Sequence, residues 1–126
     1  MSLPNFVLKH VFIPVNFLLA LSLNANYMEV KTFSKDGYLQ MVVEIPAGTN
    51  KKIEYDTNLN DFFIDKIEGI DRVIDFLPYP GNYGFIPSTK MDKERGGDGD
   101  ALDILLISES IDTGTILNVI PIGLLV

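Results

Sequence analysis

The sequence predicts a mainly β protein that folds as a small β-barrel, closed or partly open. From residue 30 onward, short apolar and β-branched segments alternate with turn residues, at the spacing typical of such barrels. No segment of useful length with helical periodicity follows residue 28. The chain has 126 residues, which is the size of one domain.

The first two expected strands are the clearest. Residues 38–45 are apolar and β-branched in their second half, and Pro46 ends the segment because proline cannot continue a strand ladder. Residues 52–56 alternate polar and apolar side chains, which predicts a half-buried strand with Lys52 and Glu54 on one face. We expect these two consecutive strands to pair with each other.

The rest of the chain continues the pattern of short strands and turns. Residues 78–87 hold three prolines and two glycines and therefore cannot be helical. The other segments are, in order, the start of a strand at 62–64, a short apolar segment at 72–76, a charged loop at 90–97, a buried strand at 102–107 and a last strand at 116–126 that Pro121 interrupts.

Residues 1–27 differ in composition from the rest of the chain and are excluded from the expected domain, 28–126. Their apolar run, 11–23, is too short for a membrane-spanning helix, which needs roughly 20 residues. It has the length of the apolar region of a signal peptide, which would direct export. The alternative is a wrongly assigned N-terminal extension, with Met28 as the true start.

Charge and composition narrow the function. The formal net charge is −7, so we expect no nucleic-acid partner. The chain has no cysteine and one histidine, which argues against a zinc or iron site of the usual kind. We also expect no stable membrane span.

Three carboxylates lie within six residues at Asp98, Asp100 and Asp103. Carboxylates packed this closely repel one another unless a cation neutralises them, and oxygen-only ligands suit Mg²⁺ or Mn²⁺. A regular strand would point Asp103 away from the other two, so the chain must bend, and Gly99 makes a bend inexpensive. One alternative is a solvated turn. Another, an EF-hand loop, fails because its fifth position would be Leu102.

Two further groups bear on the chemistry. Lys52 and Glu54 share a strand face, and Glu44 lies near the end of the preceding strand, so these charges cluster if the strands pair. The alternative is a solvated edge with cross-strand ion pairs. Tyr79 and Tyr83 lie in the rigid Pro/Gly-rich segment, where the phenol groups either donate hydrogen bonds to phosphate or fill the core.

Together, these segments resemble the family I soluble inorganic pyrophosphatases from about residue 42 to residue 126. Residues 42–54, VVEIPAGTNKKIE, resemble the family's V-x-E-I-P element and the K-x-E that comes after it. Residues 79–87, YPGNYGFIP, are similar to its Y-x-x-N-Y-G segment. Residues 98–103, DGDALD, resemble its D-x-D-P-x-D signature, with Ala101 in place of the commoner proline.

The resemblance implies an OB-like barrel of the pyrophosphatase type that hydrolyses inorganic pyrophosphate with several Mg²⁺ ions, Mn²⁺ being an alternative. It implies a cytoplasmic homo-oligomer. Residue by residue, it implies that Asp98 and Asp103 ligate activating Mg²⁺ and that Asp100 is the general base. It implies that Glu44 acts on the metals that accompany the substrate. The pyrophosphate oxygens would be bound by Lys52, Arg72 and Tyr83, and the pocket would be supported by Glu54 and Tyr79.

The chain departs from the family pattern at its end, where it stops with residues 121–126. Family members continue with a further acidic metal-binding segment, another lysine, a Tyr-Lys pair and a helical region. We therefore expect residues 28–126 to be the N-terminal part of the barrel domain, with the C-terminal part missing and with little or no activity alone. The alternative function is a noncatalytic module that binds divalent metal.

Overall fold

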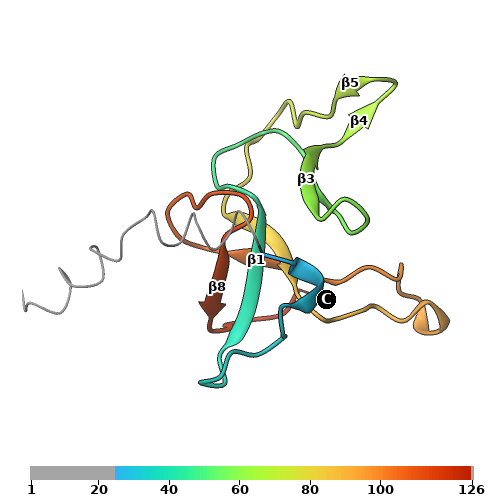
Figure 1. Ribbon diagram of the computed structural model, residues 1–126. Helices are drawn as coiled ribbons and strands as arrows, with labels where there is room; N and C mark the ends of the chain where they lie inside the picture. Colours follow the sequence, from blue (N-terminus) through green and yellow to red (C-terminus); the bar gives the residue numbers. More distant parts are fainter. Residues whose placement is uncertain (1–24, 126) are drawn as a thin grey trace, which may run out of the picture.

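The computed structural model describes residues 25–125, and it is mainly β. Figure 1 shows the strands of a central sheet with a thinner hairpin region beside it. In chain order the elements are the 3₁₀ helix η1 (Tyr27–Glu29), the strands β1 (Leu39–Ile45), β2 (Ile53–Asp56), β3 (Asp61–Ile64), β4 (Lys66–Ile67), β5 (Ile70–Asp71) and β6 (Asn82–Ile86), the 3₁₀ helix η2 (Lys93–Arg95), and the strands β7 (Leu102–Leu106) and β8 (Ile116–Val119). Within this part of the chain, no helix is long and apolar enough to cross a membrane.

The central sheet is antiparallel, with strand order β7-β6-β1-β8. Strand β1 is buried on both faces, because Met41, Val42 and Val43 are each 0% exposed. Side chains alternate along a strand, so Met41 and Val43 share one face. There they form a core with Val119 of β8. The apolar second half of the predicted strand 38–45 is therefore the part that the fold buries.

The opposite face of the sheet carries an aromatic cluster. Phe85 of β6 lies opposite Val42 in the ladder, and its ring stacks on Tyr55 of β2 with the centroids 5.5 Å apart. Tyr55 also contacts Tyr27 and Phe62, with centroid distances of 5.3 Å to each. This cluster attaches the β2–β3 hairpin to the sheet, since neighbouring rings in edge or stacked contact stabilise one another.

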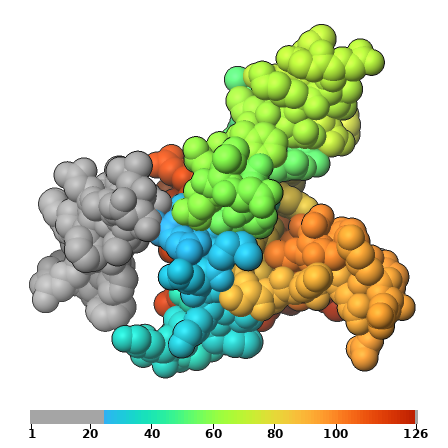
Figure 2. Space-filling view, turned by 45° about the vertical axis from the view of Figure 1, so that its right-hand side comes forward, coloured from blue at the N-terminus to red at the C-terminus, as the bar shows by residue number. Residues whose placement is uncertain are grey.

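Two hairpins make up the rest of the strands. β2 pairs with β3, and β4 pairs with β5 across the Glu68-Gly69 turn. Both turn residues have positive φ, 53° and 82°, which glycine adopts without strain. In the space-filling view these hairpins form the green segment that projects from the body (Figure 2).

Three expectations about the strands are wrong. Strand β1 does not pair with β2, because β6 and β8 occupy its two sides. Strand β7, expected to be buried, has Leu102 and Leu105 exposed by 43% and 42%, because β7 has a neighbour on one side only. The last strand ends at Val119, and residues 120–125 adopt no strand. Among residues 25–125 the sheets do not close into a barrel, so of the two predicted forms the described part has the open one.

Strand β6 has no counterpart among the expected strands, although it lies at the centre of the sheet. It runs through the Pro/Gly-rich segment, which is not helical, as expected. A Cβ atom on Gly84 would overlap the carbonyl oxygen of Val42 in β1. Glycine is therefore required where the two backbones approach most closely.

The domain includes residues just before Met28. Tyr27 is 5% exposed, and its hydroxyl donates a hydrogen bond to the Gly114 carbonyl oxygen at 2.9 Å. The predicted signal peptide falls mainly on residues 1–24, which lie outside the described residues.

Candidate active site

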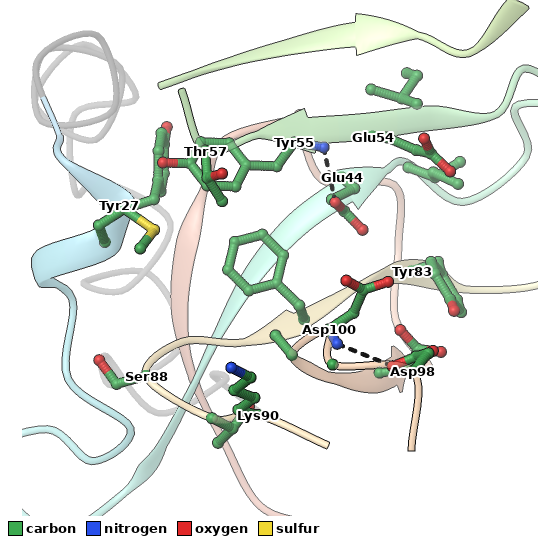
Figure 3. Close-up of a pocket in the computed structure, with 18 of the residues that line it drawn as sticks. Tyr27, Glu44, Glu54, Tyr55, Thr57, Tyr83, Ser88, Lys90, Asp98 and Asp100 are labelled. Carbon is green, nitrogen blue, oxygen red and sulfur yellow. Dashed lines mark hydrogen bonds between the residues drawn. The ribbon is translucent and has the colours of Figure 1, made fainter. Parts of the chain in front are cut away.

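A pocket of about 760 Å³ lies on the aromatic face of the sheet (Figure 3). Its position results from the strand register, because Tyr83 and Phe85 of β6 share a face and Asp103 of β7 lies opposite Phe85. Strand β2 and the loop between β6 and β7 complete the walls. Seven of the nine predicted site residues line it, namely Glu44, Lys52, Glu54, Tyr83, Asp98, Asp100 and Asp103.

The Asp98–Asp103 segment bends as the sequence predicts. Gly99 has φ of 93°, and the backbone N–H of Asp100 donates a hydrogen bond to Asp98 Oδ1 at 2.9 Å. Strand β7 begins only at Leu102, so Asp103 projects from the sheet while Asp98 and Asp100 project from the turn before it. The turn therefore delivers all three carboxylates to one pocket, as expected.

Glu44 is the most perturbed carboxyl group of the pocket. The β1–β6 register shifts between Val43 and Ile45, and such irregularities redirect a side chain. The Glu44 carboxylate accepts a hydrogen bond from the backbone N–H of Tyr55 at 2.9 Å, which is how β1 and β2 meet without pairing. Burial raises the pKa of Glu44 to about 7; the Tyr55 hydrogen bond opposes this rise and the Glu54 carboxylate adds to it.

Tyr83 presents a protonated phenol to the pocket. Burial raises its pKa, and a hydrogen bond to the carboxylate of Asp103 raises the pKa further. The phenol therefore keeps its proton and remains a hydrogen-bond donor. Its ring lies 5.8 Å, centroid to centroid, from that of Tyr79.

Lys52 lies directly before β2 and supplies positive charge to the pocket. Its ammonium group forms an ion pair with Glu54, two residues along the chain. Lys52 Nζ also lies 4.0 Å from Oδ2 of Asp65, the residue opposite it across the β2–β3 hairpin, which is the cross-strand ion pair of the alternative interpretation. The clustering of Glu44, Lys52 and Glu54 was thus correctly expected, but for a wrong reason, since the strands carrying them do not pair.

Arg72 and Tyr79 are not among the residues that line the pocket. The guanidinium of Arg72 binds Asp65 instead, with Nη1 3.1 Å from Oδ2. Tyr79 contacts the ring of Tyr83. The roles predicted for these two residues remain predictions.

The donor set of the pocket suits a hard divalent cation. Five carboxylates line it, against the two ammonium groups of Lys52 and Lys90. All candidate ligand atoms are oxygens, and the raised pKa of Glu44 reflects in part the repulsion from Glu54 and Asp103. In the portion that the structure describes, no group of three or more acidic, histidine or cysteine side chains has metal-binding geometry. The pocket residues therefore suit a divalent cation by their chemistry and shared location, and not by a ligand geometry that is already formed.

A sequence model of the inorganic pyrophosphatase family matches residues 41–126. The chain belongs to the inorganic pyrophosphatase family. An inorganic pyrophosphatase from Neisseria meningitidis is 41% identical over 90 residues, which cover 71% of this chain and 45% of that protein. One from Synechocystis sp. is 35% identical over 92 residues, covering 72% of this chain and 48% of that protein.

Solved structures of inorganic pyrophosphatases share the fold. The one from Thermus thermophilus matches with a TM-score of 0.58 and 36% identity, covering 73% of this chain and 48% of that chain. The chain spans about half the length of the pyrophosphatases that it matches. The family resemblance and the mainly β fold class predicted from the sequence are therefore confirmed.

Several residues of this pyrophosphatase pocket were not predicted from the sequence. Lys90 lines the pocket from the loop after β6, and Tyr55 lines it from β2 (Figure 3). No sequence pattern singles out either residue, and Lys90 is only one of several charged residues in the loop 90–97. Asn82 of β6 was not predicted either; it does not line the pocket, but it is fully buried and accepts hydrogen bonds from the N–H groups of Ala47 and Ile111 at 3.0 and 2.8 Å.

Proposed function

We propose that this chain forms the substrate pocket of an enzyme that hydrolyses inorganic pyrophosphate to two phosphates. The observation that carries the proposal is the shared pocket: the three Asp98–Asp103 carboxylates, Glu44, Lys52 and Tyr83 line one cavity in a chain of this family. Because the chain spans about half the length of its relatives, the activity is proposed for the protein that contains this segment.

Asp98, Asp103 and Glu44 are the residues that would hold Mg²⁺. When bound, Mg²⁺ supplies positive charge to the phosphate oxygens and lowers the pKa of water. Asp100 lies after Asp98 in the turn and lines the same pocket, so its carboxylate can take the proton of the attacking water. An acidic pocket can thus accept an anionic substrate, because the cation changes the sign of the local charge.

The remaining residues bind and orient the substrate. The ammonium group of Lys52, which forms an ion pair with Glu54, also donates charge-assisted hydrogen bonds to pyrophosphate oxygens when the substrate is bound. The protonated phenol of Tyr83 donates to a further oxygen, where charge accumulates during the reaction, after its O–H turns from Asp103 to the substrate. Arg72 is proposed as a more distant phosphate ligand, because its guanidinium forms an ion pair with Asp65 in the structure. Glu54 and Tyr79 support Lys52 and Tyr83, respectively.

The resemblance supports three further proposals. The preferred metal is Mg²⁺, with Mn²⁺ as a substitute. The complete protein is a cytoplasmic homo-oligomer. Sedimentation of the complete protein and a comparison of both metals in the same assay test these points.

The decisive experiment compares Asp100→Asn with the parent, both in the protein that contains this segment, in two measurements, pyrophosphate binding in the presence of Mg²⁺ and phosphate release. We expect that parent protein to bind pyrophosphate only with Mg²⁺ and to release phosphate. Asp100→Asn should keep most of the binding and lower release at least about 100-fold, the contribution typical of a general base. Asp36→Asn, which changes an exposed carboxylate outside the pocket, is the matched control.

Two results would contradict this proposal. Phosphate release that survives Asp100→Asn would show that the assigned base is wrong. Binding of Mg²⁺ without binding of pyrophosphate would favour the noncatalytic metal-binding module.

A further inference from the structure

Three residues from separate stretches of the chain are joined in a closed ring of backbone hydrogen bonds. The N–H of Lys52 donates to the carbonyl oxygen of Arg72 at 3.0 Å, and the N–H of Arg72 donates to that of Asp65 at 2.7 Å. The N–H of Asp65 then donates to the carbonyl oxygen of Lys52 at 2.8 Å. The ring fixes the three Cα positions relative to one another, whatever the side chains do.

The side chains of the same residues converge on one atom. Asp65 Oδ2 lies 3.1 Å from Arg72 Nη1 and 4.0 Å from Lys52 Nζ. The Asp65 side chain is only 24% exposed and that of Lys52 only 29%, so solvent screens this attraction less than it would on an open surface. One carboxylate oxygen thus faces both cations predicted to bind phosphate.

Asp65 does not line the pocket, whereas Lys52 and Glu54 do. The ammonium group of Lys52 therefore lies between a carboxylate inside the pocket and a second carboxylate outside it. Lysine has a flexible four-carbon stem, and its position is set by the groups that hold its ammonium. Without Asp65, only carboxylates inside the pocket would attract it.

We propose that Asp65 is a positioning residue for substrate binding: its carboxylate places the Lys52 ammonium, and anchors Arg72 beside it, for contact with pyrophosphate oxygens. This inference rests on the proposed function, because that function identifies the ligand. Removal of the carboxylate adds net positive charge, so charge alone predicts tighter anion binding, whereas lost positioning predicts weaker binding. The sign of the effect therefore separates the two.

Asp71 provides a matched control. It lies close by in the β4–β5 hairpin, and its carboxylate pairs with Lys51 and Lys66, at 3.9 and 3.1 Å. Neither lysine lines the pocket. Asp71→Asn therefore makes the same change in charge without disturbing a predicted substrate ligand.

The test measures pyrophosphate binding by calorimetry, with Mg²⁺ present, for the parent chain, Asp65→Asn and Asp71→Asn. We expect Asp65→Asn to bind about tenfold more weakly, the size of one charge-assisted hydrogen bond. Asp71→Asn should bind as tightly as the parent or slightly tighter. In a chain already carrying Lys52→Ala, Asp65→Asn should have little further effect, because the two changes act on one contact. Equal or tighter binding by Asp65→Asn would overturn the proposal.

A second measurement does not depend on pyrophosphate. The rate at which a lysine-specific acylating reagent modifies Lys52, read by peptide mass spectrometry, should rise in Asp65→Asn and stay unchanged in Asp71→Asn. An unchanged rate in Asp65→Asn would show that Asp65 does not hold Lys52. A raised rate in a chain that fails to bind pyrophosphate would instead locate the failure in the proposed function.

Discussion

Among single residues, Glu44 ties the folding of the domain to the charge in its pocket. Its folded-state pKa is raised to about 7 by burial and by its carboxylate neighbours. A carboxyl group with a raised pKa binds a proton more readily in the folded state than in the unfolded state. It therefore contributes stability below its unfolded pKa of 4.5, and this contribution is lost as the pH rises through 7.

This predicts a specific pH dependence in metal-free buffer. The free energy of unfolding of the parent chain should fall by up to about 3 kcal/mol between pH 4.5 and pH 7.5 through Glu44 alone. Glu44→Gln keeps an acceptor for the Tyr55 N–H but cannot ionise, so its stability should vary less over this range. Urea unfolding of both proteins at several pH values checks this. Parallel curves for the two proteins would contradict the assignment.

Among the secondary-structure elements, strand β6 depends on how closely its backbone approaches β1. The antiparallel ladder places Gly84 opposite Val43, and the Val42 carbonyl oxygen occupies the space of a Cβ atom at this position. A side chain there would separate the two central strands, which carry Glu44 and Tyr83. The geometry of the pocket therefore depends on a glycine that has no chemical role.

Gly84→Ala should consequently destabilise the domain by about 3 kcal/mol, the upper end of the range typical of overpacking in a core. Gly123→Ala is the control, because a Cβ atom there meets nothing within 4 Å. Thermal unfolding followed by circular dichroism should show a large loss for the first variant and none for the second. Near-equal melting temperatures would show that β1 and β6 can separate at low cost.

Taken as a whole, the described chain combines open sheet edges with several exposed large apolar side chains. Strands β7 and β8 form the two edges of the central sheet. Ile122 and Leu124 lie beyond β8 and are exposed by 89% and 88%. Open edges beside exposed apolar side chains favour association with other chains.

We therefore predict that the 126-residue chain associates as its concentration rises, as measured by analytical ultracentrifugation. The double variant Ile122→Lys, Leu124→Lys should shift the equilibrium toward the monomer, because it adds like charges to the apolar surface. Leu59→Lys, at a residue 73% exposed in the turn between β2 and β3, should leave association unchanged. A concentration-independent sedimentation coefficient for the parent would contradict this prediction.

Sequence patterns were enough to predict the fold class, most of the strands and seven of the residues that line the pocket. Local chemistry suffices for much of this: β-branched runs, proline stops and the Asp-Gly-Asp turn act over a few neighbouring residues. The local pattern left the roles of Glu44 and Tyr83 open between functional and structural interpretations, and the family motifs decided in favour of predicted site residues.

Only the folded chain shows which strands pair, which sheet edges are open and which charged side chains form ion pairs. Strand β6 was not predicted because the segment around it, residues 78–87, holds three prolines and two glycines, which suit a loop. Only the close approach of β1 explains why Gly84 suits a central strand. The contact of Asp65 with Lys52 and Arg72 likewise depends on a ring of backbone bonds between separate segments. Such long-range contacts arise from packing the whole chain, so no short stretch of sequence encodes them.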